Sequence, residues 1–239
     1  MSSMTPNHPT MSHSQQPQII PSDPDTELIR TVCTGLIGSK ITIGFTITLP
    51  DGDTHSGDSG NCNIIGNCME DILLPVLRKS VPTLEEGPPG QPPDYFNGKN
   101  KEWDWELKVF KDAPNFDSSN SNSYIKQLEK DTYRKLKTQY LIFKYSIENQ
   151  TVTITDFKLL HVGDMISYSG KNPISLQSKK GTWYNIRPCS YKQMGINKTP
   201  ALFIEGICKA ILECPNLDKE KSKDEIINNI RSQWNSMQL

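Results

Sequence analysis

The segment from Glu102 to Lys111 constrains the fold most, because apolar and polar side chains alternate along it with a period of two residues. Large apolar side chains at the odd positions alternate with a mainly ionisable set at the even positions: Trp103, Trp105, Leu107 and Val109 against Asp104, Glu106, Lys108 and Phe110. Side chains two residues apart leave the same face of a β-strand, so this period predicts a strand with its odd face in the core. Its even face is costly to bury unless it is hydrated or binds a metal ion.

The strand has a predicted partner immediately upstream. Asp94-Tyr95-Phe96 precedes Asn97-Gly98, and an Asn-Gly pair between two such runs is typical of a β-hairpin turn. Eleven residues separate Asp94 from Glu106. The hairpin therefore predicts that the Asp94 carboxylate meets Glu106 and Lys108 at one end of the strand.

This constellation suits a metal-dependent hydrolysis. Hard Mg²⁺ prefers carboxylates, backbone carbonyls and water, and these could come from Asp94, Glu106 and the carbonyl of Leu107. Cleavage of a phosphodiester needs a metal that neutralises phosphate oxygens and acidifies the attacking water. Lys108 would orient or deprotonate that water, or stabilise the developing charge. The plainer alternative is that Asp94 caps a turn, while Glu106 and Lys108 form an ion pair on an edge strand.

Hydrophobic periodicity predicts a mixed α/β architecture for the rest of the chain. Helices are expected over Pro24–Leu36, Asn63–Lys79, Ser121–Lys135, Ala201–Leu212 and Lys223–Met237, and further strands over Lys40–Leu49, Tyr140–Ser146 and Thr151–Leu160. Pro50–Asn61 and Pro82–Pro93 are expected to be loops. The order predicts a central mixed β-sheet flanked by helices on both faces, with a parallel crossover from Glu102–Lys111 to Tyr140–Ser146.

Length and composition favour one domain. Residues 25–239 are expected to form it, and residues 1–24, rich in Ser, Pro, Gln and Asn, to be a disordered tail. A mean hydropathy of −0.55 and the lack of an 18-residue apolar run exclude a membrane span. No signal peptide is visible, and the six cysteines include no C-x₂-C pair. This pattern favours free cysteines in a reducing, cytoplasmic setting over a disulfide or zinc role.

The net charge of −1 conceals a basic region. Residues 98–200 carry 17 Lys and Arg against 10 Asp and Glu. Taken alone, this excess favours ordinary solvated lysines, but its position around and after Glu106-Leu107-Lys108 suits contact with phosphates. Candidate DNA contacts within it, on two short strands around a basic turn, are Lys171, Asn172, Gln177, Lys179, Lys180, Trp183, Tyr184, Asn185 and Arg187. The alternative is a basic surface hairpin with Trp183 and Ile186 in the core. His161 is interpreted as structural.

Pro93-Asp94 and Glu106-Leu107-Lys108 together resemble the PD-(D/E)XK nuclease superfamily, and within it the type II restriction endonucleases. Glu70, in Asn67-Cys68-Met69-Glu70, resembles a further glutamate that many of these enzymes place near the metal. The segment 180–188 is similar to a Gly-aromatic-Ile-Arg-Pro stretch of the mismatch-repair nicking endonuclease and its restriction-enzyme relatives. The resemblance covers about residues 60 to 190.

The resemblance implies a restriction-endonuclease-like sheet with the site at one edge. It further implies Mg²⁺-dependent cleavage of double-stranded DNA at a short sequence, 5′-phosphate and 3′-hydroxyl ends, and a homodimer acting on a palindrome. Asp94, Glu106, Lys108 and Glu70 are then the expected catalytic residues. Two other functions stay open: a repair or recombination nuclease of the same fold that nicks one strand, and a DNA-binding protein without catalysis.

Overall fold

The computed structural model describes residue 20 and residues 23–50, 52–57, 62–99, 101–148, 150–168, 174–179, 182–196, 199–214 and 221–237. The helices in these ranges are α1 (Thr26–Gly35), α2 (Cys62–Arg78), α3 (Ser121–Lys130), α4 (Thr132–Lys137), α5 (Val162–Met165), α6 (Pro200–Glu213), α7 (Lys223–Ser236) and a 3₁₀ turn (Tyr191–Gln193). The strands are β1 (Lys40–Thr42), β2 (Phe45–Thr48), β3 (Thr54–Gly57), β4 (Leu84–Glu86), β5 (Tyr95–Asn97), β6 (Asp104–Phe110), β7 (Ser119–Asn120), β8 (Gln139–Glu148), β9 (Thr151–His161), β10 (Leu176–Lys179) and β11 (Thr182–Ile186).

Six of the described strands form a central sheet in the order β1-β9-β8-β6-β5-β4. β6 and β8 are parallel, and the other four neighbouring pairs are antiparallel. The predicted mixed sheet and the parallel connection through a helical segment are therefore confirmed. The Asp94–Phe96 hairpin is also present, since β5 pairs antiparallel with β6 and Tyr95 lies opposite Trp105.

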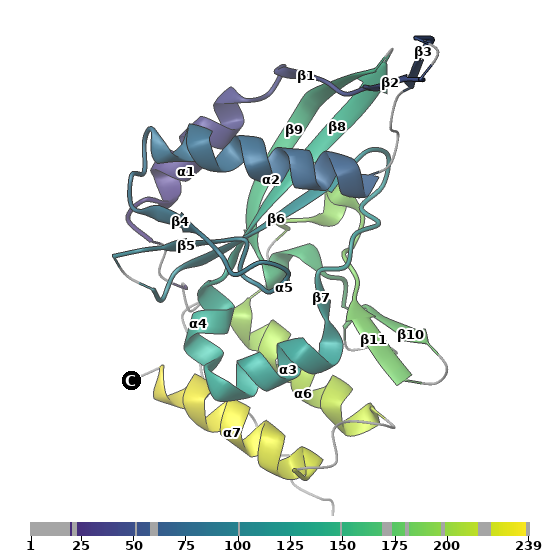
Figure 1. Ribbon diagram of the computed structural model, residues 1–239. Helices are drawn as coiled ribbons and strands as arrows, with labels where there is room; N and C mark the ends of the chain where they lie inside the picture. Colours follow the sequence, from purple (N-terminus) through teal and green to yellow (C-terminus); the bar gives the residue numbers. More distant parts are fainter. Residues whose placement is uncertain are drawn as a thin grey trace, which may run out of the picture.

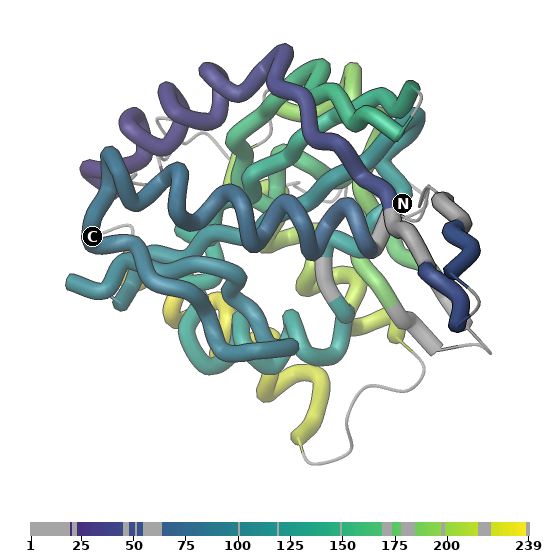
Figure 2. The backbone as a smooth tube through the Cα atoms, turned by 45° about the horizontal axis from the view of Figure 1, so that its top comes forward, coloured from purple at the N-terminus to yellow at the C-terminus, as the bar shows by residue number. Residues whose placement is uncertain are grey.

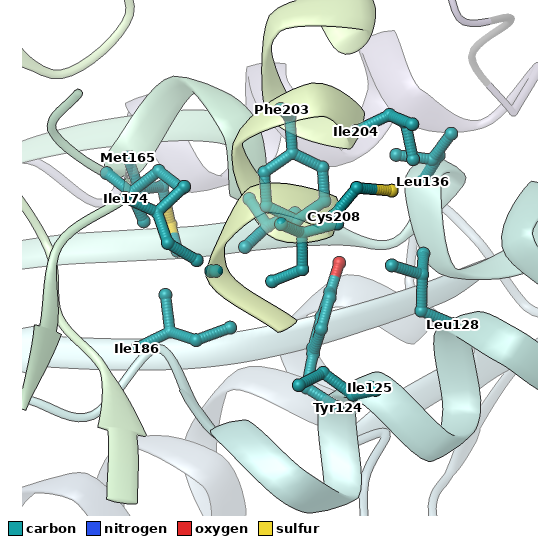
Figure 3. Close-up of a cluster of buried hydrophobic side chains, with 14 of the residues drawn as sticks. Tyr124, Ile125, Leu128, Leu136, Met165, Ile174, Ile186, Phe203, Ile204 and Cys208 are labelled. Atoms are coloured by element: carbon teal, nitrogen blue, oxygen red, sulfur yellow. The ribbon is translucent and has the colours of Figure 1, made fainter. Parts of the chain in front are cut away.

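Helices cover both faces of this sheet. α1 and α2 lie together on one side, and α3, α6 and α7 lie on the other (Figures 1 and 2). Each side has its own core. The first contains Ile29, Leu73 and Trp105, and the second places the Tyr124 ring edge-on against Phe203 at 6.0 Å between centroids (Figure 3).

Both faces of β6 are covered. The odd face lies in the first core as predicted, with Trp105 and Leu107 buried, but the even face is covered as well. On the even face Phe110 is fully buried in the second core, and Asp104 and Glu106 are only 5% and 7% exposed. The alternating pattern identified a strand but not its central position in the sheet. Charged residues on a strand that is buried on both faces give the same sequence pattern as a face exposed to solvent.

Three elements also differ from the prediction. The Lys40–Leu49 strand divides into β1 on the central sheet and β2 in a separate pair with β3, which lies in the expected Pro50–Asn61 loop. β4 forms inside the expected Pro82–Pro93 loop because it pairs with β5. Of these short strands, β1 depends on a distant partner, β9, while β2 pairs with β3 and β4 with β5 along neighbouring stretches of the chain.

One predicted helix is confirmed and another differs in detail. α2 continues through Pro75 to Arg78, close to the predicted end at Lys79. The Ser121–Lys135 helix is two helices, because Asp131 leaves helical geometry and its side chain accepts a hydrogen bond from the Arg134 N–H as the cap of α4. In the described ranges, no helix has the length and apolar character needed to span a membrane.

Both lysines of α4, Lys135 and Lys137, are buried. Lys137 is 1% exposed, lies 4.4 Å from the centroid of the Trp103 ring and donates to Glu102 Oε2 at 3.0 Å. Lys135 is 7% exposed and lies 5.3 Å from the centroid of the Tyr124 ring. Aromatic faces and acceptors on β6 and its approach replace the water that these cations lose.

The ion pair of Asp104 and Arg134 ties α4 to β6. Arg134 Nε and Nη2 donate to the two carboxylate oxygens, each at 2.9 Å. Asp104 is buried, while the Arg134 side chain is 40% exposed. Because loss of one partner would leave a buried charge uncompensated, this pair holds the crossover against the strand that carries Glu106.

Replacing Arg134 with Met should lower the free energy of unfolding by about 2–3 kcal/mol, toward the low end for a broken buried pair because Arg134 is partly exposed. Urea unfolding at neutral pH measures this. The matched control is Arg30→Met, which breaks the exposed pair with Glu27 and should cost under about 1 kcal/mol. Equal effects of the two substitutions would contradict a special role for the buried pair.

Candidate active site

A cleft of about 730 Å³ opens beside the β5–β6 hairpin. One wall carries Glu70 from α2, Asp94 from the approach to β5, and Glu106 and Lys108 from β6. These are the four residues that the sequence predicted as catalytic. The Pro-Gly segment 87–93 forms its rim, and parts of β7, α3 and β11 form the second wall.

Asp94 is held against β6 by a backbone hydrogen bond. The N–H of Leu107 donates to Asp94 Oδ2 at 2.6 Å. Oδ1 accepts no hydrogen bond from the residues that the structure describes. The side chain is half-buried and lines the cleft, so Oδ1 can bind a group that enters it.

Glu106 is the most deeply buried carboxylate of the cleft, with 7% exposure. Its Oε2 lies 3.6 Å from Lys108 Nζ, which makes an ion pair rather than a close hydrogen bond. Burial raises the pKa of Glu106, against the positive charge of Lys108, and the negative charge of Asp94 raises the pKa further. The residue thus carries a desolvation cost that a bound cation would relieve.

Glu70 joins this group from the other side of the hairpin. Partial burial raises the pKa of Glu70, and the charge of Asp94 raises it further, while Lys108 lowers it. The Tyr95 hydroxyl donates to the backbone carbonyl of Glu70 at 3.1 Å and so ties α2 to β5. That contact explains why a helix residue 24 positions upstream reaches the Asp94 carboxylate.

The donor set fits a hard divalent cation. Asp94 and Glu106 offer carboxylate oxygens, and no group of three or more His, Cys, Asp or Glu side chains able to hold a metal occurs in the described ranges. An ion held by Asp94 and Glu106 would complete its shell with a backbone carbonyl, such as that of Leu107, and with water. Mg²⁺ commonly binds in this way because it gives up its waters reluctantly.

The residues predicted to contact DNA lie partly outside the described ranges and partly on or next to β10 and β11. Lys171, Asn172 and Lys180 lie outside the described residues. Gln177 is exposed on β10, and Lys179, Trp183 and Tyr184 lie on β10 and β11.

Asn185 lines the second wall of the cleft and is 5% exposed. Arg187 pairs with Asp117 and donates from Nη2 to the Asn115 carbonyl at 3.0 Å. The guanidinium therefore fastens the segment that follows β6 rather than facing solvent unpaired.

Several cleft residues were missed in the sequence. Ser118, Asn120 and Ser123 line the second wall, and Lys135 lies close enough to Glu106 for their charges to interact. Asn120 and Ser123 have the spacing of a helix cap and its third residue, which the sequence does show. Nothing in that spacing says that the helix starts at a cleft, because β7 is placed there by pairing with β11, 65 residues downstream.

Comparison with known proteins gives three consistent matches. The family model described as NgoBV restriction endonuclease matches residues 60–237. The type II restriction enzyme NlaIV of Neisseria lactamica is 33% identical over 164 residues, which cover 64% of this chain and 67% of that protein. The solved structure of the NlaIV restriction endonuclease has a TM-score of 0.72 at 22% identity and covers 92% of this chain and 90% of its own, which shows a shared fold.

Burial of Glu106 makes a prediction about stability. The pKa of Glu106 is higher in the folded than in the unfolded protein. In the pH range between these two pKa values the native state binds more protons, so stability falls as pH rises through that range. Glu106→Gln should therefore raise the midpoint temperature of the metal-free protein at pH 8 by about 2–4 °C, the shift that about 1 kcal/mol produces at this size. The gain should vanish below about pH 4, where the wild-type carboxyl is neutral.

Differential scanning calorimetry with a chelator measures this difference. Glu205→Gln serves as the control, because Glu205 is exposed on α6 and pairs only at the surface with Arg231. It should change the midpoint by less than Glu106→Gln and in the opposite direction. A loss of stability in Glu106→Gln at pH 8 would show that the Lys108 pair outweighs desolvation.

Proposed function

The chain belongs to the NgoBV restriction endonuclease family, and we propose that it cuts DNA with Mg²⁺ bound between Asp94 and Glu106. It is a type II restriction endonuclease, a site-specific deoxyribonuclease acting on double-stranded DNA. The observation that carries the proposed mechanism is the convergence of Asp94, Glu106, Lys108 and Glu70 on one cleft. The matched region, residues 60–237, contains all four.

In this proposal each residue has a separate role. A bound Mg²⁺ would supply charge neutralisation at the scissile phosphate and a more acidic water. Asp94 and Glu106 would hold it, with Asp94 oriented by the Leu107 N–H. Lys108, 3.6 Å from Glu106, would hydrogen-bond the attacking water and stabilise negative charge on the phosphate. Glu70 would orient the Lys108 amine through the charge interaction between them.

The negative charge of the cleft couples the binding of metal to the binding of DNA in this proposal. Six carboxylates line the cleft, and of these Asp117 is paired with Arg187; the others are Glu70, Asp71, Glu86, Asp94 and Glu106. A DNA phosphate approaching this wall without a cation would be repelled. We infer that metal and DNA bind with positive cooperativity, since each neutralises charge that opposes the other.

Two further parts of the proposal concern assembly and location. A homodimer would place two such clefts on a palindromic site and cut both strands, since a two-fold protein matches a two-fold sequence. Sedimentation with and without DNA measures that state. A cytoplasmic location agrees with the thiols of Cys33, Cys68, Cys189, Cys208 and Cys214, none of which forms a disulfide within the part of the chain that the structure describes.

Metal addition should stabilise the folded protein through the carboxylates. At a free Mg²⁺ concentration ten times the dissociation constant, wild type should gain about 1.4 kcal/mol of unfolding free energy. Asp94→Asn and Glu106→Gln should lose most of this gain, because each removes a charged ligand. Asp112→Asn, an exposed aspartate just beyond β6, is the control and should respond like wild type. An undiminished response in Asp94→Asn would place the cation elsewhere.

The decisive experiment is incubation with genomic DNA and Mg²⁺, followed by sequencing of the fragment ends. Wild type should cut both strands at one short sequence. Asp94→Asn and Lys108→Met should each lower the cleavage rate at least about a thousandfold, because each removes a group that acts on the transition state. Binding of the mapped site in Ca²⁺ should persist in Lys108→Met.

Two matched substitutions control for general damage to the strand. Lys111→Met and Asp112→Asn change the same residue types at exposed positions just after β6 and should cleave within about threefold of wild type. Full activity of Asp94→Asn or Lys108→Met would overturn the assigned roles. Cuts in one strand only would instead support a nicking nuclease of the same fold.

A further inference from the structure

We infer that the second wall of the cleft binds a phosphate of the DNA backbone, a site that rests on the proposed function. This polar wall consists of Ser118, Asn120, Ser123 and Asn185, at the junction of β7, α3 and β11. It faces the same cleft as the carboxylates. Its ligand would be a phosphate other than the one that is cut.

The first observation is a buried hydroxyl without a partner. Ser118 is 3% exposed, and its Oγ makes no hydrogen bond within the described part of the chain, although the residue lines the cleft. Its backbone is fixed, since the Ser118 N–H donates to the Ile186 carbonyl at 2.9 Å. Buried polar groups are nearly always paired, so a solvent-excluded hydroxyl without a described partner, on a residue that lines the cleft, favours an acceptor supplied by a ligand.

The second observation is the start of α3, ten residues long, at the same place. Asn120 caps the helix by accepting from the Ser123 N–H at 3.1 Å. The N–H groups of Ser121 and Asn122 stand in the first turn, where no helix carbonyl can accept from them. Such a turn favours an anion through its open N–H groups and the helix dipole.

Hydroxyl chemistry also favours an acceptor-rich ligand. Ser123 Oγ accepts from Gln127 Nε2 at 3.3 Å, which leaves its proton able to donate to another group. Ser121 Oγ, 1% exposed, likewise has no described partner. A cluster of hydroxyl and amide donors suits phosphate oxygens, which only accept.

The polar wall carries less negative charge than the wall with the proposed metal ligands. Its one acidic neighbour, Asp117, is paired with Arg187, so its charge is neutralised locally. The opposite wall carries Glu70, Asp94 and Glu106. A DNA strand entering the cleft can therefore place the scissile phosphate at the metal side and a neighbouring phosphate on the polar wall. This contact would set the position of the strand without reading its sequence.

The direct test is Ser118→Ala, with binding measured by fluorescence anisotropy in Ca²⁺ on the duplex mapped by cleavage. Affinity should fall about tenfold, as expected for a hydrogen bond to a charged group. The fall should be similar on an unrelated duplex, because a phosphate contact is independent of sequence. Thermal stability should stay equal or rise, since the lost hydroxyl has no partner among the residues that the structure describes. Ser146→Ala, exposed on β8, should match wild type in both measurements.

A second variant separates binding from folding. Ser123→Asp puts a negative charge at the third position of α3, where it stabilises a helix but repels a phosphate. The protein should be at least as stable as wild type, yet bind DNA at least about tenfold more weakly. Leu202→Asp adds the same charge at the same position of α6, away from the cleft, and should bind within about twofold of wild type.

The phosphate itself can be identified with duplexes that carry one neutral methylphosphonate each. One position should weaken wild-type binding and leave Ser118→Ala binding unchanged, because the contact is already absent there. Wild-type affinity in Ser118→Ala and in Ser123→Asp would overturn the inference while cleavage stays intact. Absence of cleavage by wild type would instead remove the proposed function, so the two failures are distinguishable.

Discussion

The hydrogen bond from the Leu107 N–H to Asp94 Oδ2 is the contact on which the site depends. It extends the β5–β6 hairpin past its last paired residue and brings an acidic side chain to the strand that carries Glu106 and Lys108. α2 is attached to the same hairpin through the Tyr95 hydroxyl and the Glu70 carbonyl. Two backbone hydrogen bonds thus assemble three carboxylates from separate segments.

Burial gives this assembly its chemical character. β6 is covered on both faces, so Glu106 must lose most of its water. Its raised pKa reflects a cost that Lys108 offsets only in part across 3.6 Å. In the proposed metal site, a cation entering the cleft would offset this desolvation cost and so would gain affinity from few ligands.

The central sheet fixes the geometry of the cleft by means of remote partners. β6 lies beside β8 in parallel, which requires the α3–α4 crossover to return along the sheet. The Asp104–Arg134 pair holds this crossover against β6, and β7 at its start pairs with β11. The same crossover therefore contributes side chains both to the second core and to the second wall of the cleft.

Local sequence determined much of this. The period-two pattern identified β6, and Asn97-Gly98 identified the hairpin that brings Asp94 beside Glu106. The carboxylates, the lysine and their match to restriction endonucleases also came from short motifs, since catalytic chemistry needs particular groups at a spacing that one hairpin can supply.

Long-range packing decided the remaining features. That β6 is covered twice, that Lys135 and Lys137 are buried, and that β7 and α3 border the cleft all depend on pairing and packing between distant segments. Ser118 shows the difference most clearly, because a serine in a polar loop has no distinctive sequence pattern. Only its burial beside a helix start, without a partner, makes it a candidate ligand, and burial is a property of the folded chain rather than of any window of residues.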